Sequence, residues 1–190
     1  MPTWIVPLGV LAAIAGISYF ANRRVAGQFQ RLSTVLKGRV RFSFFGPSYA
    51  GRYQGHEVCL RWRHPTRQTP AYLYLEMSKP ASFMLTIARE GFWTRLGKQV
   101  GVVQEVTIQD PLFDEAFYIR SSHAGQARSY LQHADHRQTI EKLFSERGAD
   151  LFMIQPHGVV VRKPRSQGTM ITPDEVIQDL EWLERLANGY

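Results

Sequence analysis

The sequence has a single cysteine, Cys59, so no intramolecular disulfide can form, and a cysteine-rich zinc site is excluded as well. It contains no internal repeat and no low-complexity segment. It also lacks the composition of a disordered chain, because 44% of its 190 residues are hydrophobic and 12% are aromatic. This length and composition fit one ordinary domain with a hydrophobic core.

Signatures of catalysis are absent too. No phosphate-binding glycine loop, nucleophile elbow, kinase motif or dinucleotide motif occurs in the chain. His133 and His136 are three residues apart, unlike the i, i+4 pair of a zinc protease, and Cys59 has no identifiable acid–base partner. We therefore predict no catalytic residue, no metal site and no cofactor.

Acidic residues are scarce in the first half of the chain. Residues 22–104 hold 14 Lys+Arg and 3 Asp+Glu, whereas residues 105–190 hold 9 and 13, and the whole chain has a net charge of +7. A basic surface in the first half favours a partner that carries negative charge.

The N-terminal segment has no charged side chain before Arg23. As a helix, the apolar run from Trp4 to Ala21 covers about 27 Å, close to the roughly 30 Å of a bilayer core. Trp4 and Tyr19 suit the two membrane interfaces, and Arg23 and Arg24 follow as a stop. We expect residues 1–21 to be a transmembrane anchor, since a cleaved signal peptide needs a preceding basic stretch and small residues at the cleavage site.

The charge distribution predicts the orientation of such an anchor. Basic residues directly after a span are retained in the cytoplasm, so we expect a single-pass protein of a bacterial inner membrane with its N-terminus outside. Two pairs of small residues, Gly9 with Ala13 and Ala12 with Gly16, allow close packing of a second helix. The alternative is a span that is merely rich in alanine and glycine.

Residues 22–37 continue in a helical pattern. Val25, Phe29, Leu32 and Leu36 form an apolar stripe with basic residues around it. We expect a juxtamembrane amphipathic helix that either lies on lipid headgroups or docks onto the folded domain.

Beyond Gly38 the apolar period changes from helical spacing to alternation, which predicts strands with short connections. A further strand is expected at 102–108, followed by a turn at Asp110–Pro111. Helices are expected at about 124–131, at 135–147 with Asp135 as N-cap, and after Thr172, where an N-cap, a proline and two acidic residues follow one another. Residues 162–168 have the composition of a polar linker. The predicted class is α+β: one N-terminal transmembrane helix, then a cytoplasmic domain at 38–190 with a mostly antiparallel sheet and two to four helices. A subdivision near residue 101 is left open.

One face of the predicted sheet is basic and aromatic. Alternation places six side chains away from the core: Arg39, Arg41, Arg61, Arg63, Tyr72 and Tyr74. Guanidinium groups fit phosphate oxygens in pairs and tyrosine rings stack on planar groups, so the face suits an acidic protein, an anionic lipid or a nucleic acid. The alternative is a solvated face that only maintains solubility.

The loop at 91–98 joins large aromatic side chains to cations. Trp93 and Arg95 fit a segment that enters the membrane interface, or else the aromatic residues close one end of the core. From these features we expect a non-catalytic accessory or scaffold protein that binds a partner within a membrane complex. The alternatives are an anionic-lipid or nucleic-acid binder, with nucleic acid less favoured, and third an enzyme of unknown reaction.

Overall fold

The alternating segments after Gly38 form strands of a single sheet in a computed structural model of the chain, which describes residues 22–43, 46–89, 104–166 and 168–189. The strands are β1 (Arg39–Ser43), β2 (Gly46–Tyr53), β3 (His56–Arg63), β4 (Ala71–Ser78), β5 (Leu85–Arg89), β6 (Gln104–Glu105), β7 (Phe117–Ser121), β8 (Leu151–Gln155) and β9 (Gly158–Arg165). Every pairing is antiparallel, as the sequence predicts.

The sheet joins the two halves of the chain. Its order is β1-β2-β3-β4-β9-β8-β5-β7-β6, so the meander β1–β4 is followed by the C-terminal hairpin β9–β8 and only then by β5. The register between β4 and β9 pairs Ser78 with Gly158 and Ala71 with Arg165. Strands from both sides of residue 101 therefore belong to one sheet.

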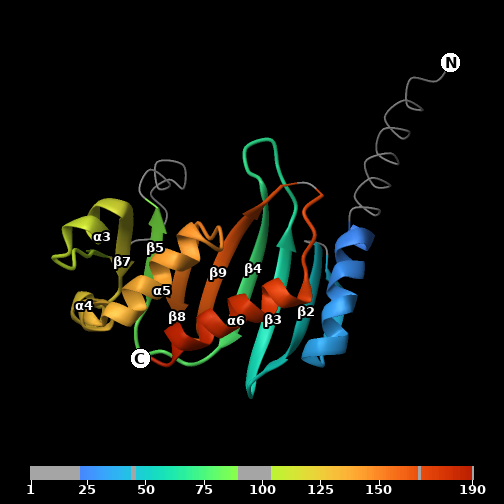
Figure 1. Ribbon diagram of the computed structural model, residues 1–190, viewed down its shortest axis with the longest axis horizontal. Helices are drawn as coiled ribbons and strands as arrows, with labels where there is room; N and C mark the ends of the chain where they lie inside the picture. Colours follow the sequence, from blue (N-terminus) through green and yellow to red (C-terminus); the bar gives the residue numbers. More distant parts are fainter. Residues whose placement is uncertain (1–21, 44–45, 90–103, 167, 190) are drawn as a thin grey trace, which may run out of the picture.

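Five helices accompany the sheet in the described residues. They are the helix at 22–36, α3 (Pro111–Ala116), α4 (Ala124–Gln132), α5 (Ala134–Ser145) and α6 (Pro173–Ala187). Figure 1 shows α5 and α6 crossing one face of β8, β9, β4 and β3, with the helix at 22–36 beside the β1–β2 end. The buried side chains of all five helices join one cluster with alternate strand residues, so the helices share one face of the sheet.

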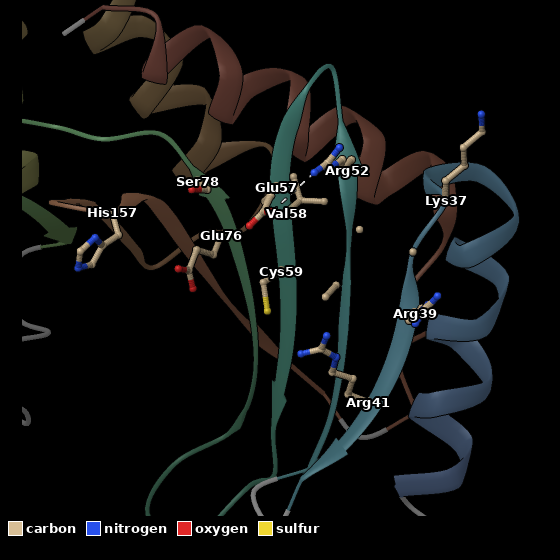
Figure 2. A pocket seen from close by; sticks show the side chains of 13 residues that line it. Lys37, Arg39, Arg41, Arg52, Glu57, Val58, Cys59, Glu76, Ser78 and His157 are labelled. Carbon is tan, nitrogen blue, oxygen red and sulfur yellow. Dashed lines mark ion pairs between the residues drawn. The ribbon is translucent and has the colours of Figure 1, made fainter.

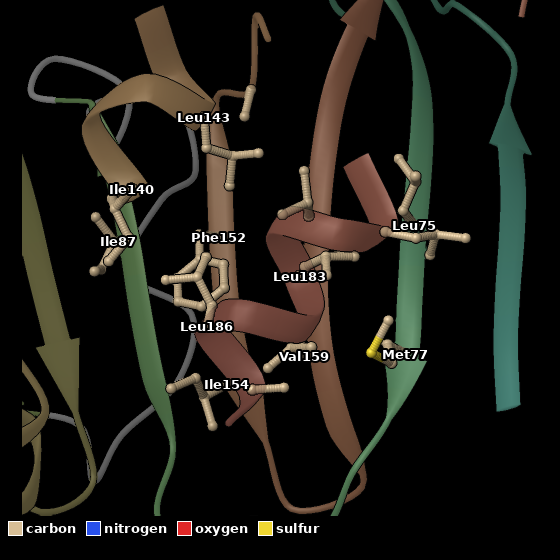
Figure 3. Close-up of a cluster of buried hydrophobic side chains, with 14 of the residues drawn as sticks. Leu75, Met77, Ile87, Ile140, Leu143, Phe152, Ile154, Val159, Leu183 and Leu186 are labelled. Carbon is tan, nitrogen blue, oxygen red and sulfur yellow. The ribbon is translucent and has the colours of Figure 1, made fainter. Parts of the chain in front are cut away.

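The core lies between that face and the helices. Leu75 and Met77 of β4, Phe152 of β8 and Leu183 and Leu186 of α6 are fully buried and gather there, as Figure 3 shows. Burying such a side chain contributes about 1.5–3 kcal/mol, so docking of α6 is a main source of stability. The opposite face of β1–β4 carries the polar members of the alternation.

Local signals explain where α6 begins. The Thr172 hydroxyl accepts a hydrogen bond from the Glu175 backbone N–H at 3.3 Å, and Pro173 occupies the first turn, where its missing N–H costs nothing. Asp174 and Glu175 lie at the positive end of the helix dipole. The prediction for this helix is confirmed.

The helix at 22–36 docks onto the domain rather than presenting its apolar stripe to lipid. Phe29 and Leu32 are fully buried, and Val25 and Leu36 nearly so. The Gln28 side-chain oxygen accepts a hydrogen bond from the Ile171 N–H at 3.0 Å, and His64 bonds Asn22 at 2.5 Å. These contacts settle the alternative that the sequence left open for this segment.

The predicted fold class is wrong in its transmembrane helix. Among the residues that the structure describes, no helix is both long and apolar enough to cross a membrane. The longest, 22–36 and α6, have 15 residues each, about 22 Å of helix, and each carries charged side chains. The predicted anchor at 1–21 lies outside the described residues, and the single-pass assignment is not retained. Residues 38–190 hold four described helices, α3 to α6, within the predicted two to four, and the fifth is the separately predicted helix at 22–36.

Several predicted boundaries are corrected. Of the strand expected at 102–108, the structure describes 104–108, and within that part only β6 is strand. The turn expected at Asp110–Pro111 is the start of α3, with the Asp110 carboxylate accepting from the Phe113 N–H at 3.3 Å. The N-cap of α5 is His133, not Asp135. The polar segment at 162–168 is not a linker throughout, because its first four residues belong to β9.

Candidate functional site

The strand register places the six predicted binding residues on one face of the sheet, which we call the Arg/Tyr face: Arg39, Arg41, Arg61, Arg63, Tyr72 and Tyr74. Arg61 is paired with Tyr74 and Arg63 with Tyr72 across β3 and β4. The intervening residues, such as Leu60 and Trp62, are buried on the helix-covered face. The face therefore follows directly from alternation.

The centre of this face is a set of interacting arginine and tyrosine side chains, the Arg/Tyr ladder: Arg61, Arg63, Tyr72, Tyr74 and Arg162. The Arg162 guanidinium carbon lies 4.4 Å from the Tyr72 ring centre, and that of Arg63 lies 5.9 Å from the Tyr74 ring centre. The two tyrosine rings meet edge to face with centres 6.3 Å apart. Such contacts hold these long side chains in defined positions.

Arg162 is the member of the ladder that sequence reasoning missed. It is only 6% exposed and binds Asp150 through two hydrogen bonds, Nε to Oδ1 at 2.8 Å and Nη2 to Oδ2 at 3.0 Å. Alternation could have identified Arg162, because Val159, Val161 and Lys163 occupy every second position of a strand after the hairpin and Arg162 lies between two of them. The polar composition of the segment from residue 162 onward favoured a linker instead.

Next to the ladder lies an open hollow of about 750 Å³, which is lined mainly by residues of β1–β4 and which we call the basic groove. Its charged lining residues are Lys37, Arg39, Arg41, Arg52, Glu57 and Glu76, and it is also lined by Cys59, Ser78 and His157. Figure 2 shows the Arg41 side chain extending from β1 over the neighbouring strands toward Cys59. Sequence reasoning identified Arg39 and Arg41 but not Lys37 or Arg52, whose positions depend on the strand register.

The cations of the basic groove outnumber its acids, and the acids are engaged. Glu76 forms an ion pair with Arg61 of the ladder, and Glu57 lies 4.0 Å from Arg52, with both of these side chains about three-quarters exposed. Within the part of the chain that the structure describes, no acidic side chain pairs with Lys37, Arg39 or Arg41. The groove is thus suited to an anion.

Nucleophilic chemistry is not favoured at the groove. Burial raises the pKa of the Cys59 thiol above its ordinary value of 9.0, so the thiol stays protonated near neutral pH. Elsewhere in the described residues, no group of three or more potential metal ligands occurs. The arrangement offers charge and aromatic surface rather than a reactive nucleophile.

The remaining predicted site residues separate into two sets. Arg23 and Arg24 are exposed at the start of the helix at 22–36. The others lie outside the described residues: Trp4, Gly9, Ala12, Ala13, Gly16, Tyr19, Trp93 and Arg95.

Comparison with known proteins gives a fold relationship. No protein-family model matches the chain, and no curated protein sequence matches it significantly. Among solved structures, the chain is similar to the crystal structure of the mycobacterial trehalose monomycolate transport factor A, TtfA, with 9% sequence identity and a TM-score of 0.52. The alignment covers 86% of this chain and 92% of that one, so the two proteins share their fold over nearly their whole length.

Proposed function

We propose that this chain is a non-catalytic accessory protein of a membrane-associated process, and that its Arg/Tyr ladder binds an acidic surface on a protein partner. The ladder is the single observation that carries the proposal. Arginine and tyrosine are, with tryptophan, the residue types that most often dominate binding energy in protein interfaces, and here they form one ordered patch.

Charge supports an acidic partner. Arg61 and Arg162 keep their own acidic neighbours, while no described acidic side chain pairs with Arg63. With the cations of the adjacent groove, the whole face has an excess of positive charge that would steer an acidic surface into place.

The fold relationship to TtfA is compatible with an accessory role, because that protein is a transport factor by name. The engaged carboxylates and the protonated Cys59 thiol argue in the same direction, since neither supplies a ready base or nucleophile.

The test is recovery of the partner with the full-length chain and matched variants. Arg63→Glu reverses an exposed ladder charge, and Arg67→Glu reverses an exposed charge in the β3–β4 loop. We expect Arg63→Glu to weaken binding about tenfold or more and Arg67→Glu to leave it nearly unchanged.

A second pair of variants isolates the aromatic contribution. Tyr74→Ala removes a ladder ring, while Tyr118→Ala removes a half-buried tyrosine from the same sheet face at β7. The proposal is refuted if the ladder variant and its control weaken partner binding equally in each pair. It is also refuted if the Arg63→Glu variant still binds the partner at high salt. Recovery of nucleic acid instead of protein would refute it as well.

A further inference from the structure

The basic groove differs from the neighbouring ladder in how its charges are used. In the ladder, Arg61 and Arg162 are held by acidic partners. In the groove, Lys37, Arg39 and Arg41 have no such partner among the described residues, and all three are exposed. Three uncompensated cations at a concave surface repel one another, and a bound anion relieves that repulsion.

The backbone at the rim of the groove provides a second, independent observation. Lys37 follows the end of the helix at 22–36 with φ of 45°, in the left-handed region that favours glycine or asparagine. A lysine in this conformation is strained, and such strain is concentrated at functional positions. The strained position is one that lines the groove.

The volume of the groove suits a small ligand. About 750 Å³ lies within the range of small-molecule sites, so a lipid headgroup fits inside it. Guanidinium groups on adjacent strand positions match the oxygens of a phosphate group better than a single carboxylate.

Charge favours an anionic lipid surface as the source of that phosphate group. The groove is open, and its cations Lys37, Arg39, Arg41 and Arg52 are all exposed, so they can approach a layer of headgroups together. Each basic residue close to an anionic membrane surface contributes about 1 kcal/mol of binding, so four together favour a membrane over a single phosphate in solution.

We propose that the basic groove binds the phosphate group of an anionic lipid headgroup, as a peripheral contact made by Arg39, Arg41, Arg52 and Lys37. This deepens the proposed function, because it names a second ligand on the same sheet face, adjacent to the ladder that binds the protein partner.

The experiment measures binding of the full-length chain to phosphatidylcholine vesicles with and without phosphatidylglycerol. The test variant is Arg39→Gln/Arg41→Gln, and the control is Arg31→Gln/Arg67→Gln, which removes the same charge from exposed positions outside the groove. Each basic residue at an anionic surface contributes roughly a fivefold change in affinity, so we expect the groove variant to lose about 25-fold and the control much less.

Further arms separate the possible sources of phosphate. Lys37→Gly removes the charge and introduces glycine, which accepts the left-handed conformation, so we expect weaker vesicle binding without loss of thermal stability.

Equal losses in the groove and control variants overturn the proposal, as does equal binding to both kinds of vesicle. Binding of inorganic phosphate or glycerol phosphate in the groove without vesicle binding also overturns it, and so does tighter, groove-dependent binding of a single-stranded oligonucleotide.

Different variants test partner binding by the ladder and headgroup binding by the groove, so either proposal can be refuted without the other. Partner recovery depends on Arg63 and Tyr74, whereas vesicle binding depends on Arg39 and Arg41. An Arg39→Gln/Arg41→Gln variant that loses vesicles and keeps the partner supports both.

Discussion

A buried ionic cluster links β9 to α6, and it gives the sharpest test of the fold. The Lys163 ammonium group is 2.7 Å from the Glu175 carboxylate and 2.7 Å from that of Asp179. Lys163 and Asp179 are 3% and 1% exposed. Replacing Lys163 by methionine keeps the apolar stem but leaves two carboxylates without their shared cation.

The expected loss of stability depends on the ion pairs that remain after the substitution. Removing one partner of a buried ion pair costs about 3–5 kcal/mol. Here Asp179 keeps Arg147 at 2.9 Å and Glu175 keeps Arg165, so we expect Lys163→Met to cost about 3 kcal/mol. For a chain of this size that corresponds to a fall of about 6–12 °C in Tm, or about 1.5 M in the urea midpoint if m is about 2 kcal/mol/M.

The assay is urea denaturation of Lys163→Met, with Lys142→Met as a matched control. Lys142 is exposed on α5, so we expect its substitution to change stability by less than about 0.5 kcal/mol. The double variant Lys163→Met/Asp179→Asn restores charge balance, and we expect its loss to be smaller than the sum of the two single losses by about 1 kcal/mol or more. A cost below about 1 kcal/mol for Lys163→Met, or strict additivity in the double variant, would refute the reasoning.

Four further substitutions or conditions test other features by the same denaturation assay. Tyr49→Phe removes a buried hydroxyl that has no hydrogen-bond partner in the described structure, and we expect it to stabilise by about 1 kcal/mol; destabilisation would contradict this. Lys37→Gly relieves the left-handed backbone, and we expect a gain of about 0.5–1 kcal/mol, where a loss would argue against strain. Thr172→Ala removes the N-cap of α6 and should cost about 1 kcal/mol, with no effect if the cap is unimportant. Although burial acts to raise the pKa of Glu175, hydrogen bonds from Arg165 and Lys163 hold it below its ordinary value of 4.5; its stabilisation is therefore present above that pH and lost below it, and Glu175→Gln should flatten the fall of the urea midpoint on acidification.

Local patterns were sufficient to predict much of the secondary structure. Alternation predicted β3 and β4 because their Leu60, Trp62, Leu73 and Leu75 point to one core and their polar neighbours do not. The start of α6 was predicted because its cap, proline and acidic residues are adjacent in the chain. Both kinds of signal depend only on residues close in sequence.

Non-local pairing explains what was missed. Arg162 and Lys163 resembled a linker, but each becomes compatible with a central strand once Asp150 on one face, and Glu175 and Asp179 on the other, provide a partner. The transmembrane prediction used the length and composition of one apolar run, whereas the described helices are short and derive their stability from the sheet.

The candidate site was partly predictable for the same reason. Alternation identified six residues of the Arg/Tyr face, since each side chain's direction is a local property. It did not identify Arg52, Lys37 or Arg162, because their proximity to that face arises from strand register and from the turn after the helix at 22–36. The division into an engaged ladder and an uncompensated groove required the positions of the carboxylates.

The place of the C-terminal hairpin in the sheet constrains how the protein is made. During synthesis β1–β4 can pair as they emerge, but the outer edge of β4 stays open until residues as late as Arg165 have left the ribosome. Since β8 and β9 join the earlier strands into one sheet, a chain that terminates before them exposes two unpaired strand edges at once. Shortened products should accordingly aggregate rather than persist as smaller folded units.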